Sequence, residues 1–139
     1  MWSSPLSKPI SVLLIDDNPT FLGIVQRFLQ SEEGIKVVGA VESGEEAIGL
    51  VHQLKPDIVL TDLAMPKVSG METILRLRAA WPKIGVIALT LLDTAAYRQA
   101  ALTAGADAFV PKDNLNTELL PTIRQVMAQK AAARGASRR

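Results

Sequence analysis

The stretch ISVLLIDDNPTF, residues 10–21, joins an apolar strand to an acidic end. Its first six residues are apolar or β-branched for the most part, as in a buried strand, and Asp16 and Asp17 follow directly. Two carboxylates about 5 Å apart in a partly shielded cleft repel each other by about 3 kcal/mol at an effective dielectric constant of about 20. Another group must therefore offset this repulsion, and the rest of the chain should supply it.

Short apolar runs alternate with segments of helical periodicity along the chain. The runs after the first are IKVVGAV (35–41), DIVLTD (57–62), IGVIALT (84–90) and DAFV (107–110). This alternation is typical of βαβ units around a parallel sheet. We expect an α/β fold with five parallel strands in the order 2-1-3-4-5, flavodoxin-like, and helices on both faces because crossovers are right-handed.

Helix boundaries are marked by capping residues. The expected starts are Asn18 before Pro19, Ser43 with Glu46 as a capping box, Gly70, and Asp93. The expected stops are Gly34, Pro82 and Gly105. The last helix is expected over 119–133, with Pro121 in its first turn, where the missing N–H is tolerated.

Composition sets the class of protein. The 139 residues, 48% of them hydrophobic, suffice for one domain, expected over 10–130 between a tail (1–9) and a basic tail or linker (131–139). There is no cysteine and no apolar run long enough to cross a membrane, so we expect a cytoplasmic protein.

Residues 1–123 carry ten basic and fourteen acidic side chains (−4), and residues 124–139 carry five basic ones. The basic end is more typical of a solvated helix or linker than of a nucleic-acid site.

Polar residues stand at the carboxyl ends of four of the expected strands. They are Asp16 and Asp17, Asp62, Thr90, and Lys112 just beyond the fifth strand. In an open α/β sheet, ligands bind at this edge. Clustered carboxylates favour a hard divalent cation such as Mg²⁺ or Mn²⁺. We therefore predict a metal site in which the cation and the lysine offset the repulsion between the acids.

Four sequence segments together resemble the receiver domain of two-component response regulators, over about residues 10–130. They are the acidic pair in IDDNP, DLAMPKVSG after the third strand, the threonine in ALT, and AGADAFVPKD around the lysine. The resemblance implies that Asp62 accepts a phosphoryl group from a phosphohistidine of a sensor histidine kinase. It also implies Mg²⁺ ligands at Asp16, Asp17, Asp62 and the main-chain carbonyl of Ala64, and a phosphate contact at Lys112.

The resemblance further implies that Thr90 and Phe109 form a switch pair. Phosphorylation would then alter the surface formed by the helix after Asp93, the strand at 107–110 and the last helix. Such a protein is a regulator rather than an enzyme, and it promotes only its own phosphorylation and dephosphorylation. Asp113 follows the lysine where the family usually has proline, a feature similar to receivers attached to LuxR-type helix-turn-helix domains. Transcription is thus the expected output, through a DNA-binding effector domain absent from this chain, with a homodimer on phosphorylation.

Other interpretations of the same residues remain open. Asp17 and Asn18 could merely cap the first helix, and Phe109 could be an ordinary core residue. A dinucleotide or P-loop site would need glycines that IDDNPTF does not contain. A haloacid dehalogenase-type phosphatase would need a second aspartate where this chain has Ala64. The main alternative is a receiver-fold module that signals through protein contacts without phosphorylation.

Overall fold

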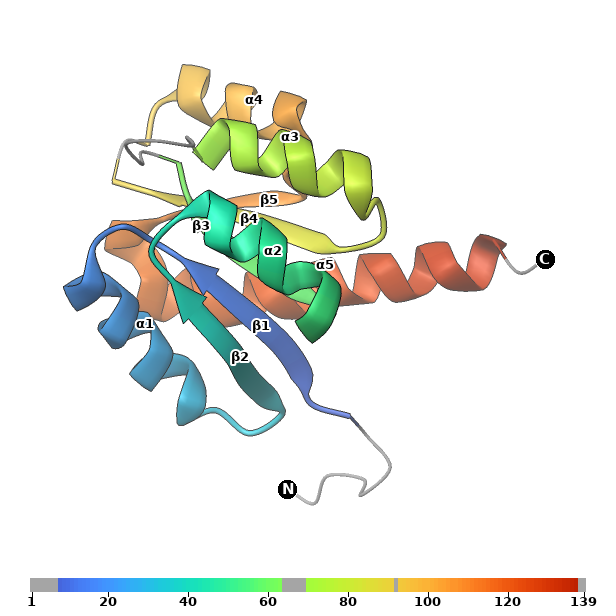
Figure 1. The fold of residues 1–139 in the computed structure, drawn as a ribbon, viewed down its shortest axis with the longest axis horizontal. Helices are drawn as coiled ribbons and strands as arrows, with labels where there is room; N and C mark the ends of the chain where they lie inside the picture. Colours follow the sequence, from blue (N-terminus) through green and yellow to red (C-terminus); the bar gives the residue numbers. More distant parts are fainter. Residues whose placement is uncertain (1–7, 64–69, 92, 138–139) are drawn as a thin grey trace.

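The strands and helices alternate along the whole described chain. A computed structural model describes residues 8–63, 70–91 and 93–137, the last four by their backbone alone. The elements are β1 (Ile10–Ile15), α1 (Pro19–Gln30), β2 (Ile35–Val41), α2 (Gly44–Leu54), β3 (Ile58–Asp62), α3 (Gly70–Ala80), β4 (Gly85–Thr90), α4 (Ala95–Ala104), β5 (Ala108–Pro111), a short 3₁₀ turn (Lys112–Asn114) and α5 (Leu115–Ser137). The strands pair in parallel in the order β2-β1-β3-β4-β5, which confirms the predicted fold (Figure 1).

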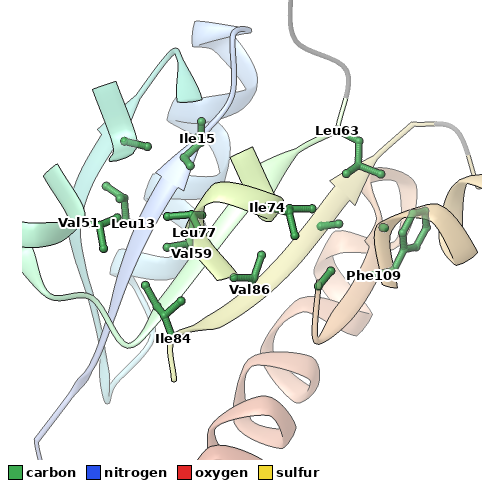
Figure 2. Packing of buried hydrophobic residues seen from close by; sticks show 14 of the residues in the cluster. Leu13, Ile15, Val51, Val59, Leu63, Ile74, Leu77, Ile84, Val86 and Phe109 are labelled. Atoms are coloured by element: carbon green, nitrogen blue, oxygen red, sulfur yellow. The ribbon is translucent and has the colours of Figure 1, made fainter. Parts of the chain in front are cut away.

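Helices cover both faces of this sheet. On one face, α2, α3 and α4 pack on alternate strand residues, including Leu13, Val59 and Val86 (Figure 2). On the other, α1 and α5 pack on the residues in between, such as Leu14 and Leu60. The central strands β1 and β3 are buried on both sides, which explains why their sequences are almost continuously apolar.

Most helix starts lie where the sequence places them. The Asn18 side chain accepts hydrogen bonds from the N–H groups of Thr20 and Phe21, and the Ser43 hydroxyl accepts one from the N–H of Glu46. The predicted cap of α4 was wrong by one residue. Thr94 is the N-cap, because its hydroxyl accepts the N–H of Tyr97, whereas Asp93 forms an ion pair with Arg98.

Two helix ends also differ from the prediction. α1 ends at Gln30 with Ser31 as its C-cap, and Gly34 lies farther on, where its positive φ turns the chain into β2. α5 runs from Leu115 to Ser137, so Pro121 lies inside the helix rather than in its first turn. Proline removes only one backbone hydrogen bond there. Apolar burial on both sides of it, at Leu119 and Ile123, offsets that loss.

No helix in the described part of the chain is long and apolar enough to cross a membrane.

Candidate functional site

The register of the sheet brings the predicted site residues to one edge. Ile15 lies opposite Thr61, so the residues that follow them, Asp16 and Asp62, emerge together from β1 and β3. Farther along the sheet, Thr90 at the end of β4 lies opposite Pro111, the residue before Lys112. Four parallel strand ends thus converge on one surface, as the sequence predicted.

Three carboxylates gather at this edge. One oxygen from each of Asp16, Asp17 and Asp62 lies within 4.8 Å of the other two. Asp16 and Asp62 are almost fully buried, at 2% and 4% exposure, whereas Asp17 is exposed. The cluster therefore has two carboxylates shielded from water and one that opens to solvent.

Lys112 supplies the positive charge that the acids require. Its Nζ lies 2.7 Å from Oδ2 of Asp16 and 3.4 Å from Oδ1 of Asp62, and its side chain is only 8% exposed. Three carboxylates and one ammonium leave a charge of −2. This charge and the oxygen-only donor set fit a hard dication such as Mg²⁺.

Asp16 also connects the cluster to the start of α1. Its second oxygen, Oδ1, accepts a hydrogen bond of 2.9 Å from the N–H of Asn18, the residue that caps the helix. The capping role proposed for this segment and its place in the acidic cluster are therefore compatible. Asn18 caps the helix, Asp16 orients the cap, and Asp17 remains exposed beside them.

Thr90 and Phe109 occupy neighbouring strands on the inside of the domain. Thr90 is 1% exposed and Phe109 is 7% exposed, and Phe109 belongs to the apolar cluster on the α2, α3 and α4 face (Figure 2). The guanidinium of Arg98 on α4 lies 4.8 Å from the centre of the Phe109 ring. Phe109 is thus a core residue in this conformation, and α4 contacts it through a charged group.

The backbone after Asp62 is held by the first residue of α3. The N–H of Gly70 donates to the carbonyl of Leu63. A Cβ at Gly70 would stand 2.1 Å from the carbonyl oxygen of Asp62 and 2.4 Å from the Cα of Leu63, so only glycine fits. Ala64, whose carbonyl was predicted as a metal ligand, lies outside the described residues.

Two contacts at the site were not predicted from the sequence. The Phe21 ring, in the first turn of α1, lies 4.2 Å from Nζ of Lys112, and Arg98 lies over Phe109. The sequence does show an aromatic residue, Phe21, three positions after the IDDN segment. Its contact with a lysine some ninety positions away depends on how α1 and the 3₁₀ turn meet in space.

Residues 12–124 match the response regulator receiver domain family, so the chain belongs to that family. Its sequence is 34% identical over 119 residues to the response regulator GacA of Pseudomonas aeruginosa, covering 86% of this chain and 56% of GacA. It is 34% identical over 123 residues to the transcriptional regulatory protein DegU of Brevibacillus brevis, covering 88% and 52%. The chain therefore spans about half the length of these relatives.

Solved structures agree with the family assignment. The signal receiver domain of the NarL response regulator from Mycobacterium tuberculosis superposes with a TM-score of 0.82 at 28% identity, covering 87% of this chain and 98% of that one. A LuxR-family two-component response regulator from Aurantimonas gives 0.83 at 27% identity, covering 88% and 87%. The chain is a receiver domain of two-component signalling, with the fold predicted from the strand and helix pattern.

Proposed function

We propose that Asp62 is the phosphoacceptor and that Lys112, Asp16 and Asp17 support its phosphorylation. The observation that carries this proposal is the buried contact of Lys112 with both Asp16 and Asp62, next to an exposed third carboxylate. Asp62 is the last residue of β3, is buried and contacts the lysine. By comparison, Asp16 also accepts the N–H of Asn18, and Asp17 is exposed. Asp62 is therefore the group best placed to react.

In the proposed step, a carboxylate oxygen of Asp62 attacks the phosphorus of a phosphohistidine on a sensor kinase. The P–N bond breaks, and the imidazole nitrogen keeps the electron pair and is protonated. Such transfers depend mainly on positioning and on neutralising the charge of the phosphoryl group. The Lys112 ammonium, already within 3.4 Å of Asp62, serves both purposes.

Asp16, Asp17 and Asp62 would hold a Mg²⁺ or Mn²⁺ ion, joined by the main-chain carbonyl of Ala64. A bound dication would supply charge neutralisation for the phosphoryl oxygens. Once Asp62 carries an acyl phosphate of about −2, the three acidic groups total roughly −4. Lys112 and a bound dication together bring +3 and leave about −1, an excess that the hydroxyl of Thr90 can share by a hydrogen bond.

The output would be a shift between two conformations of the α4, β5 and α5 surface. Thr90 moving toward the phosphate would free space for Phe109, whose ring now packs in the core under Arg98. We propose that this surface controls transcription in the cytoplasm, through a DNA-binding effector domain outside this chain. A homodimer formed on phosphorylation is part of the same proposal, with α1 and α5 as the candidate contact faces.

The proposal is tested by incubating the protein with acetyl phosphate and Mg²⁺ and measuring its intact mass. We expect the wild type to gain the mass of one phosphoryl group, and Asp62→Asn to gain none. Asp113→Asn is the matched control, because Asp113 lies beside Lys112 but is exposed and outside the carboxylate cluster. An unchanged wild-type mass, or a gain in Asp62→Asn, would remove the proposal and favour signalling without phosphorylation.

A further inference from the structure

We propose that Phe21 is a positioning residue for Lys112, holding its ammonium against Asp16 and Asp62 and keeping water away from it. The inference rests on the proposed role of Lys112 in phosphorylation and adds a residue from α1 to that machinery. It starts from one observation, the stacking of the Lys112 ammonium over the Phe21 ring at 4.2 Å from the ring centre.

Three groups in the described part of the chain lie close to the ammonium. Asp16 accepts its hydrogen bond at 2.7 Å, Asp62 lies at 3.4 Å, and the aromatic face of Phe21 covers another side. The ring is half-buried, and the lysine side chain is only 8% exposed. A cation shielded from water in this way interacts more strongly with an aromatic face than an exposed one does.

The position of Phe21 is fixed by hydrogen bonds that lead through Asn18 and Asp16 to Lys112. Its N–H donates to Oδ1 of Asn18, and the N–H of Asn18 donates to Oδ1 of Asp16. The other oxygen of Asp16 accepts the hydrogen bond from Lys112, whose ammonium lies over the Phe21 ring. The four residues therefore form a closed ring of contacts that joins the start of α1 to the end of β5.

These contacts restrain a side chain that is otherwise difficult to hold in one position. Lysine has a long, flexible side chain and a strongly hydrated point charge, so its head group is costly to hold in one place. Lys112 is the first residue of a short 3₁₀ turn, and its four-carbon stem has several rotatable bonds that must be fixed to place the ammonium. An apolar aromatic wall limits these rotations and still attracts the charge.

The direct test compares the rate of phosphorylation by acetyl phosphate in two leucine variants. Phe21→Leu keeps an apolar side chain and removes the aromatic face. Phe28→Leu is the matched control, since Phe28 is also half-buried on α1, two helical turns later and far from the cluster in sequence. We expect Phe21→Leu to lower the rate about three- to tenfold relative to Phe28→Leu, and Phe21→Tyr to restore it.

A double-mutant cycle distinguishes positioning of the lysine from a general effect on the fold. In a Lys112→Gln background the aromatic ring has no ammonium to hold. Phe21→Leu should then change the residual rate less than twofold, so that the two substitutions are not additive. An equal loss in both backgrounds would overturn the proposal.

A second readout does not depend on phosphorylation. Acetic anhydride acylates exposed lysines, and peptide mass spectrometry reports the labelling rate at Lys112. We expect Phe21→Leu to accelerate labelling at this position severalfold and Phe28→Leu to leave it unchanged. Equal labelling of Lys112 in the two variants would overturn the positioning role of Phe21. A wild type that accepts no phosphoryl group would refute the proposed function, but it would leave this labelling test valid.

Discussion

Asp62→Asn should stabilise the metal-free protein, because Asp62 lies in a cluster with excess negative charge. With an effective dielectric constant of about 20, repulsion from Asp16 and Asp17 at up to 4.8 Å amounts to about 3.5 kcal/mol each, or ~7 kcal/mol together. Attraction to Lys112 at 3.4 Å returns ~5 kcal/mol. The difference predicts a gain of about 2 kcal/mol for the neutral asparagine, and less where water screens the exposed Asp17.

The assay is urea unfolding in EDTA and again in millimolar Mg²⁺. In EDTA, we expect the free energy of unfolding to rise by about 1–2 kcal/mol in Asp62→Asn, with an unchanged slope against urea. In Mg²⁺, the wild type should gain stability by binding the ion, and the difference should shrink or reverse. Asp113→Asn should stay within about 0.5 kcal/mol of the wild type in both buffers. A less stable Asp62→Asn in EDTA would refute the charge balance.

Three further outcomes are expected. Gly70→Ala should lower the free energy of unfolding by more than about 2 kcal/mol in thermal unfolding, since the added Cβ would meet the backbone at the end of β3. The control Gly23→Ala has open space around the added Cβ and should be neutral or stabilising. Arg78→Lys should lower the free energy of unfolding in urea by about 2–4 kcal/mol, because a lysine cannot reproduce the five hydrogen bonds of Arg78 to three carbonyls and a carboxylate. The control Arg76→Lys, in an exposed ion pair, should lower it by less than about 0.5 kcal/mol. Thr90→Val should still be phosphorylated, but the amide NMR shifts across α4, β5 and α5 should then move less than in the wild type; full shifts would refute its switch role.

The strands were predictable because each is a short apolar run between residues that break or cap regular structure. β1 and β2 have the predicted bounds, and the others begin or end within one residue of them. The order 2-1-3-4-5 was expected because it places the four polar strand ends next to one another, and right-handed crossovers then put helices on both faces. The convergence of Asp16, Asp62, Thr90 and Lys112 then followed from parallel pairing, because all four stand at the same ends of their strands.

Other features depend on contacts that the sequence pattern does not encode. Lys55 ends α2 in a left-handed conformation usually taken by glycine; Pro56 directly after it marks the end of the helix but not this conformation. Arg78 joins the end of α3 to the carbonyl of Gly105 and to Asp107, which also pairs with Lys130 on α5. Such long-range hydrogen bonds are decided by how elements pack, as is the contact between Phe21 and Lys112.

α5 is longer than the helix predicted over 119–133. Pro121 favours a helix that begins near it, yet the helix starts at Leu115 directly after the 3₁₀ turn. Leu115, Leu119 and Ile123 lie four residues apart on one face and are all buried against the sheet. Burial of this apolar stripe outweighs the single hydrogen bond that proline removes.

We propose that Asp62 is the acid made ready for phosphorylation by its buried neighbours, Asp16 and Lys112. The most direct measurement is to phosphorylate the protein with acetyl phosphate and Mg²⁺, reduce the acyl phosphate with borohydride, and map the modified residue by peptide mass spectrometry. We expect conversion of Asp62 to homoserine, with Asp16, Asp17 and Asp113 unchanged. Homoserine at any other aspartate, or the same yield without a divalent cation, would contradict it.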